Sequence, residues 1–370
     1  MKTWHIWNFP DNIYISLTDE IREEFFNEMF KKVGGKRPYA RFLGLNQMAV
    51  KSYHRGSTCK NGLKHPQAIP IWVFKKSLSL MNEDLKEKLE DNIVLLKAKN
   101  KGIPIINPKL PFKESPAFYR IVAHMIGDGS ASGRKVPYYA NTCKELREQF
   151  KKDLEIFGEM KIYERKPNTT PIVCFPKVIT DILSYVLDVK FTYPDRIPKQ
   201  IFNASKECKV AFLQALFDDE GTISTNLAIS MANKNLIEEI KRLTESLGVE
   251  TNAISIKKYE TQKDNFTFSI KRDNLLKFKE KIGFSHPDKI KNLDPAINTK
   301  NRKERTRDIG MLYKLVLENL KKRRMATLEI ANNLQLTLGH TLKILKNMEE
   351  DNKVLRSGFK NKIIWSLAKV

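Results

Sequence analysis

Two segments of the chain repeat one uncommon pattern, in which an apolar helix runs directly into an acidic residue, a glycine and a strand. The segments are YRIVAHMIGDGSASG (119–133) and AFLQALFDDEGTIST (211–225). Asp128 and Glu220 hold the same place in the two copies, 92 residues apart. A repeat of this kind indicates that one chain contains two similar structural units.

The residues around each segment predict nearly the same order of helices and strands. The first unit is expected at 113–200 and the second at 201–294. Apolar residues at helical spacing predict a helix in KELREQFKKDLEIFG, and KNLIEEIKRLTESLG is its counterpart in the second unit. Short alternating stretches, among them KVPYYANT, TPIVCFP, LAISMAN and NFTFSIKR, predict the strands.

Small residues on the two apolar helices predict that these helices pack closely against each other. Ala123 and Gly127 lie four residues apart on the first helix, and Ala215 lies on the second, where Asp219 fills the matching position. Small side chains at this spacing allow two helix backbones to approach. The acidic residues at the ends of the two helices would then lie side by side.

Asp128 and Glu220, brought together in this way, would repel each other unless they shared a proton or a cation. A hard divalent ion such as Mg²⁺, or Mn²⁺, is bound by carboxylate, water and phosphate oxygens. Such an ion can stabilise the attacking and leaving oxygens of phosphodiester hydrolysis. Two exposed helix ends are the alternative, and the matched duplication favours the metal site.

The charge of the chain favours an anionic partner. Sixty-six Lys and Arg against 43 Asp and Glu give a net charge of +23, which is typical of nucleic-acid-binding proteins. The four cysteines have no metal-ligand spacing, which argues against a zinc finger. The sequence shows neither a membrane span nor a signal peptide, so we expect a cytoplasmic protein, nucleoid-associated if prokaryotic, that does not bind membranes.

IVAHMIGDG (121–129) and LQALFDDEG (213–221) resemble the paired signature of the LAGLIDADG homing endonucleases. The resemblance covers about residues 113–294 and includes the order of helices and strands. It implies an α+β fold in which two αββαββα halves form a pseudo-twofold saddle on the major groove of double-stranded DNA. It also implies a freestanding monomer that cuts both strands with divalent cations held by Asp128 and Glu220.

The chain departs from the usual signature in small ways. Alanine replaces glycine at the third position of both copies, and Asp219 replaces a residue that is usually small. Neither change removes a metal ligand. The resemblance further implies one basic residue near each catalytic pocket, after the last helix of each half. Lys190 and Lys289 are the candidates, with Lys199 as an alternative to Lys190.

Polar and basic side chains alternate with apolar ones along the predicted strands, which places the polar set on one face of each sheet. That face could read base edges and phosphates in DNA, whereas an ordinary solvent-facing sheet is the alternative. The residues expected to contact DNA are Lys161, Tyr163, Arg165, Ser255, Lys257, Tyr259, Thr267, Ser269 and Lys271.

Both ends of the chain predict further small units. Residues 1–112 are expected to form a helical unit with a helix-turn-helix at 39–56, where Gly44 makes the turn and Asn46 caps the second helix. A charged helix, NEDLKEKLEDNIVLLKAKN, and a proline-containing linker would follow. Residues 308–370 predict a winged helix. A plain helical hairpin and a dimerisation module are the respective alternatives.

The sequence therefore favours a metal-dependent, site-specific DNA endonuclease. A transcriptional regulator built on an inactive endonuclease scaffold is the second hypothesis, and an RNA maturase is the third. Retention of both Asp128 and Glu220 favours the endonuclease, because an unneeded pair of close carboxylates carries an electrostatic cost. His124, inside the first apolar helix, is expected to be a packing residue and not a ligand.

Overall fold

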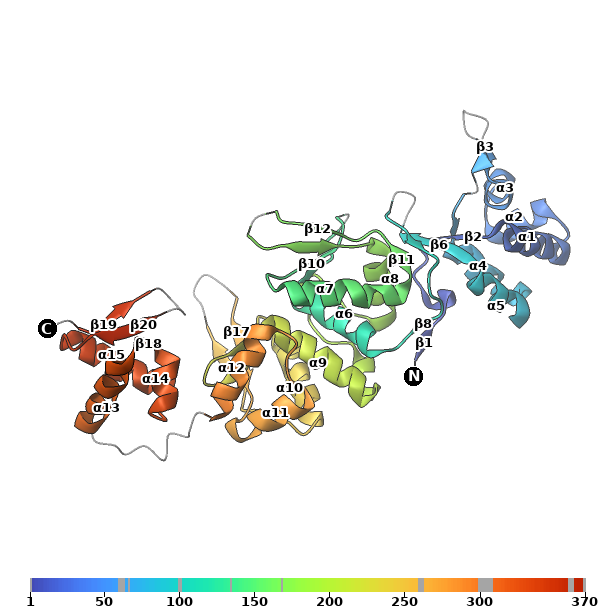
Figure 1. Ribbon diagram of the computed structural model, residues 1–370. Helices are drawn as coiled ribbons and strands as arrows, with labels where there is room; N and C mark the ends of the chain where they lie inside the picture. The colour runs from blue at the N-terminus through green and yellow to red at the C-terminus, as the bar shows by residue number, and fades with distance from the viewer. Residues whose placement is uncertain are drawn as a thin grey trace.

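The computed structural model describes residues 2–58, 64–65, 67–98, 102–133, 135–167, 169–258, 263–298, 309–358 and 363–368. Figure 1 shows an N-terminal unit, two helix-and-sheet halves and a C-terminal unit in chain order. Within these described ranges, no helix is both long and apolar enough to cross a bilayer.

The first half contains α6 (Pro116–Ile126), β9 (Gly129–Ser130), β10 (Tyr138–Ala140), α7 (Lys144–Leu154), β12 (Tyr163–Arg165), β13 (Ile172–Cys174) and α8 (Lys177–Leu187). The second contains α9 (Lys206–Glu220), β14 (Gly221–Ile223), β15 (Leu227–Met231), α10 (Lys234–Ser246), β16 (Ser255–Lys257), β17 (Asn265–Ser269) and α11 (Leu275–Lys281). The antiparallel sheets, β12-β13-β10-β9 and β16-β17-β15-β14, have matching strand orders. The predicted duplicated αββαββα fold is confirmed.

Helices α6 and α9 form the interface between the two halves. Each begins at a serine cap: the hydroxyl of Ser115 accepts the N–H of Phe118 at 3.2 Å, and that of Ser205 accepts the N–H of Cys208 at 3.3 Å. Both helices are apolar on most of their surface and run through the centre of one large core. That central position brings their C-terminal ends together.

The N-terminal unit is not purely helical, which corrects the sequence prediction. The charged helix ends early, as α5 (Glu83–Asp91), and the β-branched pair at 93–94 opens a strand, β6 (Ile93–Ala98). This strand lies inside a sheet of order β11-β7-β6-β2-β5. The other members are β2 (Ile13–Leu17), β5 (Ile69–Pro70), β7 (Ile105–Ile106) and β11 (Glu159–Met160). Because β11 belongs to the first half, the sheet joins the two units.

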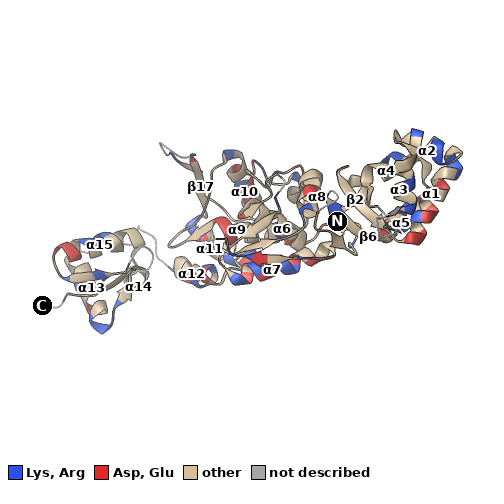
Figure 2. Ribbon diagram, turned by 90° about the horizontal axis from the view of Figure 1, so that it is seen from above, with Lys and Arg blue, Asp and Glu red and all other residues tan. Residues whose placement is uncertain are grey.

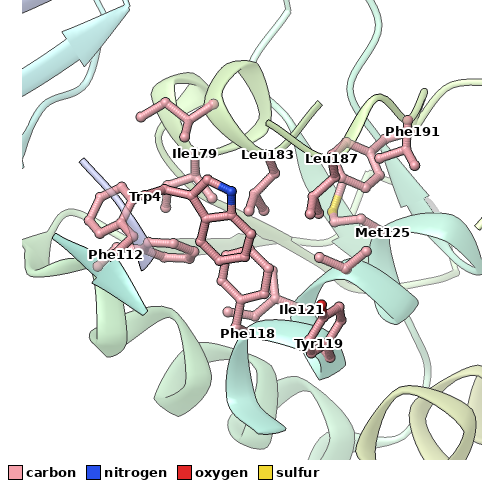
Figure 3. Close-up of a cluster of buried hydrophobic side chains, with 14 of the residues drawn as sticks. Trp4, Phe112, Phe118, Tyr119, Ile121, Met125, Ile179, Leu183, Leu187 and Phe191 are labelled. Carbon is pink, nitrogen blue, oxygen red and sulfur yellow. The ribbon is translucent and has the colours of Figure 1, made fainter. Parts of the chain in front are cut away.

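The expected linker before residue 113 is also packed into the protein and is not a free connection. Ile105 and Phe112 are buried, and β8 (Phe112–Lys113) pairs with β1 (Thr3–Trp4). Figure 3 shows Trp4 and Phe112 in one apolar cluster with α6 and α8 side chains. Trp4 stacks on Phe118 with ring centroids 4.7 Å apart. The apolar residues between the prolines explain why this segment is packed, because transferring their side chains from water to the core is favourable.

Two helices joined by a tight turn form over 39–56, with the predicted turn and cap residues, and their assignment as a helix-turn-helix stays a prediction. Helices α1 (Asp19–Val33), α2 (Lys36–Leu43) and α3 (Gln47–Arg55) follow one another, Gly44 has φ 74° at the turn, and the side chain of Asn46 accepts the N–H of Ala49 at 2.8 Å. His54 on α3 does not face solvent. It is buried, and its Nε2 lies 2.6 Å from the carboxylate of Glu23. The unit also contains α4 (Ile71–Ser77), β3 (Ser57–Thr58) and β4 (Lys64–His65).

The C-terminal unit has its own apolar core. Its elements are α13 (Ile309–Lys322), β18 (Met325–Ala326), α14 (Thr327–Asn333), α15 (Leu338–Glu350), β19 (Val354–Ser357) and β20 (Ile364–Leu367), with sheet order β18-β20-β19. Trp365 is fully buried at the centre, and its indole N–H donates to the hydroxyl of Thr327 at 2.9 Å. The helices and the two final strands fit the winged-helix prediction, which stays a prediction, whereas β18 is an additional strand.

Candidate functional site

The two central helices approach closely at Gly127 and Asp219. A Cβ atom on Gly127 would lie 2.9 Å from both Cβ and Oδ2 of Asp219, so the contact requires glycine. Ala123 and Ala215 are fully buried nearby. The three residues predicted to allow helix packing are therefore all at or near the interface.

Glycine is also needed where each helix turns into its strand. A Cβ on Gly129 or Gly221 would come within 2.4 Å of the backbone of its own preceding helix. Real Cβ atoms do not approach that closely, because such a distance is well inside van der Waals contact. The chain can therefore leave both helices directly after the acidic residue, which fixes Asp128 and Glu220 at the helix ends.

Asp128 and Glu220 carry negative charge in a confined place. Burial raises the pKa of Asp128 to about 6, and the charge of Asp219 adds to the effect. Burial also raises the pKa of Glu220 to about 7, with further contributions from the charges of Asp128 and Asp219. The helix C-termini add partial negative charge of their own. The site is therefore short of positive charge.

Asp219 is the centre of a buried hydrogen-bond network that the sequence did not predict. Its Oδ2 lies 2.8 Å from Nδ1 of His124, and its Oδ1 accepts the hydroxyl of Tyr139 at 2.7 Å. The amide of Asn141 donates both to Asp219, at 3.2 Å, and to Asp128, at 3.1 Å. A buried carboxylate at a helix contact needs hydrogen-bond partners. The presence of Asp219 at that position of the sequence was therefore the available signal that polar residues would gather around it.

His124 is a buried packing residue, as expected, and it also offsets charge. Its ring lies beside that of Tyr139, with centroids 4.7 Å apart and an interplanar angle of 46°. Burial disfavours the charged form of His124, but the charge and hydrogen bond of Asp219 outweigh burial, so the pKa of His124 is raised. The imidazole therefore offsets part of the negative charge that Asp219 adds to the helix interface.

The segment after α11 is fixed against the end of α9 by Asp218. This buried carboxylate accepts the backbone N–H groups of Ser285 and His286, each at 3.0 Å. Burial raises the pKa of Asp218 to about 6, although these hydrogen bonds act in the opposite direction. The anchor is specific to the second half, because Ile126 occupies the corresponding position of the first signature.

Lys289 lies among the site carboxylates. It belongs to the first turn of α12 (Pro287–Asn298), and its Nζ donates to the carbonyl oxygen of Phe217 at 2.9 Å and to that of Asp218. Burial lowers the pKa of Lys289, while the charges of nearby carboxylates, including Asp128 and Glu220, favour its ammonium form. The structure thus places this predicted basic residue with both predicted metal ligands.

The basic candidates in the first half are not brought to the site. Lys190 and Lys199 are exposed, and within the described part of the chain no hydrogen bond or ion pair joins either to Asp128 or Glu220. The counterpart of Lys289 is instead Arg196, because FTYPDRI (191–197) matches FSHPDKI (284–290). This second repeat could have identified Arg196 from the sequence.

Asp128 and Glu220 fit a divalent cation by the chemistry of their oxygens. Among the described residues, no group of three or more His, Cys, Asp or Glu side chains could by itself hold a metal ion. Two carboxylates are sufficient when water and a DNA phosphate complete the shell, as is common for Mg²⁺. Burial, with the neighbouring carboxylates, raises the pKa of both acids, and a bound cation would favour their charged forms.

In the sheet of the second half the predicted alternation is present on β17, whereas on β16 the apolar Ile256 is exposed like its polar neighbours. Thr267 and Ser269 point away from the core, whereas Phe268 between them is buried. Ser255 and Lys257 are exposed on the edge strand β16. The remaining two predictions differ: Lys271 lies beyond the end of β17 and forms an ion pair with Glu250 at 2.7 Å, and Tyr259 lies outside the described residues.

The sheet of the first half shows the same alternation on its edge strand. Tyr163 and Arg165 share a face, and the Arg165 guanidinium lies 5.7 Å from the centroid of the Tyr163 ring. Between them, Glu164 pairs with Lys151 on α7 at 2.7 Å, on the helix-covered side. Lys161 is exposed just before the strand.

Comparison with known proteins identifies one part of the chain. Residues 207–283 match the family described as a LAGLIDADG-like domain. This range extends from α9 to just beyond α11 and so includes the second signature with Asp218, Asp219 and Glu220.

The similar curated proteins are much longer than this chain. A glutamine–fructose-6-phosphate aminotransferase of Methanocaldococcus jannaschii is 27% identical over 207 residues, which is 53% of this chain and 18% of that protein. A probable translation initiation factor IF-2 of Thermococcus kodakarensis is 26% identical over 298 residues, 77% of this chain and 24% of that protein. The chain spans about a quarter or less of these relatives.

Two solved structures are also similar. The homing endonuclease I-DmoI in complex with DNA and Mn has 17% identity and a TM-score of 0.35, over 46% of this chain and 98% of that chain. Full-length DUF199/WhiA from Thermatoga maritima has 10% identity and a TM-score of 0.33, over 64% of this chain and 90% of that chain.

Proposed function

We propose that this protein, which has a LAGLIDADG fold and a LAGLIDADG-like domain at 207–283, is a divalent-metal-dependent endonuclease for specific sites in double-stranded DNA. The observation that carries the proposal is the pair Asp128 and Glu220. Both acids are held where positive charge is short, at the ends of two helices related by the internal repeat.

DNA binding rests on charge and on the two polar sheet faces. A net charge of +23 attracts the phosphate backbone, and exposed strand residues such as Arg165 and Ser255 offer hydrogen bonds to bases and phosphates. The two sheets have equivalent strand orders, so they suit the two halves of one target site. Because both halves lie in one chain, the protein would act as a monomer.

Asp128 and Glu220 would hold Mg²⁺ or Mn²⁺, which when bound supplies a Lewis acid for phosphodiester hydrolysis. In that reaction the oxygen of water bonds to phosphorus, and one deoxyribose oxygen leaves with a proton. Asn141 holds the Asp128 carboxylate in position through its amide. Lys289 provides a fixed positive charge beside the reacting phosphate, a role in which preorganised donors contribute strongly.

The flanking units would add contacts to DNA outside the saddle. Figure 2 shows Lys and Arg on α2 and α3, the helix-turn-helix elements. The helix, strand, two helices and two strands of the C-terminal unit are consistent with a winged helix, with α15 as its recognition helix. His340, Lys343 and Asn347 are exposed on α15 at helical spacing.

A DNA-binding regulator that has lost cleavage is the second candidate. The observation that favours it is the first half, where Arg196 is paired with Asp188 at 3.1 Å and does not reach the carboxylates. A regulator would keep the sheets and the flanking units and would not need metal. The two functions therefore differ in one measurable property, the production of DNA ends.

The test exposes a long randomised duplex library to the protein with Mg²⁺ and, separately, with Ca²⁺, and sequences both retained DNA and new ends. We expect new ends at one motif with Mg²⁺ only. Asp128→Asn should retain the same DNA without producing ends, while Lys206→Met, an exposed change far from the site, should cut normally. Enriched intact DNA without ends would establish the regulator, and full-rate cutting by Asp128→Asn would contradict the metal-site assignment.

A further inference from the structure

A cavity of about 530 Å³ opens beside Glu220, between the two halves of the protein. One wall comes from the first half, around the end of α6 and from Tyr193 and Pro194, which follow α8. The opposite wall comes from the second half, from the end of β15, the start of α10 and the start of β17. Its volume lies within the range of about 300–1,000 Å³ that is usual for small-ligand sites. The cavity therefore has room for a ligand next to one of the two proposed metal-binding acids.

The surroundings of Glu220 are more open than those of Asp128. Gly129 pairs with Tyr139 and Gly221 with Ile229, so Asn141 and Met231, two residues further on, hold equivalent positions. Asn141 donates to the Asp128 carboxylate at 3.1 Å. Methionine has no N–H or O–H to donate, and Met231 lines the cavity instead. The protein thus leaves polar lining groups on this side for a ligand to meet.

The polar part of the lining offers hydrogen-bond acceptors. The Oδ1 atom of Asn265 is buried, and in the described part of the chain it has no hydrogen-bond partner. A buried acceptor without a donor is unfavourable, so this atom points to a donor that a ligand supplies. The carboxylate of Asp264, the neighbouring residue, lies in the same lining. Two adjacent acceptors suit an amino group, whereas they would repel a phosphate or a carbonyl oxygen.

The remaining lining is apolar and aromatic. Ile126, Met231 and Leu236 contribute apolar surface, and Tyr193 contributes its ring. The Tyr193 side chain is 82% exposed, and Nζ of Lys263, from the second half, lies 4.9 Å from the centroid of its ring. An exposed aromatic ring beside a basic residue is typical of surfaces that stack bases and hold the adjoining phosphate. The lining therefore suits a flat base with an amino group at its edge.

Tyr193 is held in an uncommon backbone conformation. Its φ of 54° lies in the left-handed region, which bulky residues rarely adopt. Pro194 follows it and favours extended backbone in the residue before a proline. Strain of this kind persists where the surrounding structure maintains it, and it concentrates at functional sites. The exposed ring is thus presented beside the cavity at a cost in free energy.

We propose that the cavity binds one base of the DNA, turned out of the duplex near the cleavage site, with Tyr193 as its stacking surface and Asn265 and Asp264 as acceptors for its amino group. A base inside a duplex cannot enter a recess in a protein unless it rotates out about its backbone. Adenine, cytosine and guanine carry an amino group and thymine carries none, so thymine is disfavoured at this position. The proposal rests on the DNA binding of the proposed function and does not require cleavage.

The experiment uses the full-length protein, Ca²⁺ and duplexes that carry the motif recovered from the randomised library. 2-Aminopurine, an amino-bearing base whose fluorescence is quenched by stacking in a duplex, replaces one base at a time around the centre of the motif. We expect the protein to raise the fluorescence severalfold at one position. In a second set of duplexes, a mismatch at that same position should tighten binding by about tenfold, because a base that is already unpaired is turned out at less cost.

Three variants test the lining. Tyr193→Ala should abolish the fluorescence rise and weaken binding by about tenfold, since it removes the stacking surface. Tyr185→Ala is the matched control, because Tyr185 is also an exposed tyrosine but lies on α8, outside the cavity lining, and it should behave as wild type. Asn265→Leu removes the unpartnered acceptor and should reduce the preference of the wild type for an amino-bearing base over thymine.

The outcomes separate this proposal from the nuclease. A wild-type protein that binds the motif but shows no fluorescence rise and no mismatch effect at any position would overturn the base site and leave the nuclease intact. Retention of the full rise by Tyr193→Ala would overturn the base site as well. A rise in a protein that makes no DNA ends with Mg²⁺ would keep the base site and overturn the nuclease, and a protein that binds no duplex would overturn both.

Discussion

Replacing Glu220 by glutamine should stabilise the metal-free protein at alkaline pH. Burial and the charges of Asp128 and Asp219 raise the pKa of this carboxyl from its ordinary value of 4.5 to about 7. The folded protein therefore holds a proton on Glu220 over a pH range in which the unfolded chain has released it. The contribution of this carboxyl to the free energy of unfolding is therefore complete below pH 4.5 and is lost as the pH rises toward and through 7.

The size of the effect follows from that difference in pKa. A shift from 4.5 to about 7 corresponds to about 3 kcal/mol at about 1.4 kcal/mol per pH unit. Most of it, about 2 kcal/mol, should be lost between pH 5 and pH 8. Glutamine has nearly the same shape and no charge. The Glu220→Gln protein should therefore lose about 2 kcal/mol less than wild type over this interval.

The assay is urea unfolding in EDTA at pH 5 and pH 8, followed by circular dichroism. Glu280→Gln, at an exposed acid on α11, is the matched control and should follow wild type. Adding Mg²⁺ at pH 8 should stabilise the wild type and the control more than Glu220→Gln, because an ion that binds only the folded state favours that state. Parallel pH profiles for wild type and Glu220→Gln would refute the electrostatic account of this site.

Three further results are expected. Gly127→Ala should lower the free energy of unfolding by about 1–3 kcal/mol, since its Cβ would lie 2.9 Å from Asp219; Gly339→Ala, in open space on α15, should be neutral or stabilising in the same thermal melts. Asn46→Ala should cost about 1 kcal/mol, measured by urea unfolding, because it removes the cap of α3. DNA affinity, measured by fluorescence anisotropy, should fall steeply as salt rises, and a flat response would contradict binding along the two sheets.

The duplicated fold could be predicted because its strongest constraints are local. An apolar helix that ends on an acid and a glycine is visible in a short window, and its second copy removes most ambiguity. The N-terminal sheet was missed for the opposite reason. β5, β7 and β11 are two-residue strands that exist only because distant segments pair with them. Nothing within such short segments distinguishes a strand from a loop.

The candidate site was predictable in its acids and less so in its supporting residues. Asp128 and Glu220 follow from the motif, but Asn141 comes to Asp128 only through the fold of β10 and the turn after it. Asp219 looked unfavourable as an isolated residue at a helix contact, because its partners come from a different helix and from a strand. Arg196 lies outside the helix signature and is identified only by a second, shorter repeat, FTYPDRI with FSHPDKI.

The stacking of Trp4 on Phe118 has a consequence for the target. This ring pair belongs to an apolar core that continues without a break from the N-terminal unit into the first half, so these two parts form one rigid body. A rigid body that contacts DNA at two places fixes both the distance and the rotational phase between those two places. If the N-terminal unit contacts DNA as proposed, one extra base pair between its contacts and those of the first half would shift it by about 3.4 Å and rotate it by about a tenth of a helical turn. Natural targets should therefore tolerate base changes in that interval far better than insertions or deletions.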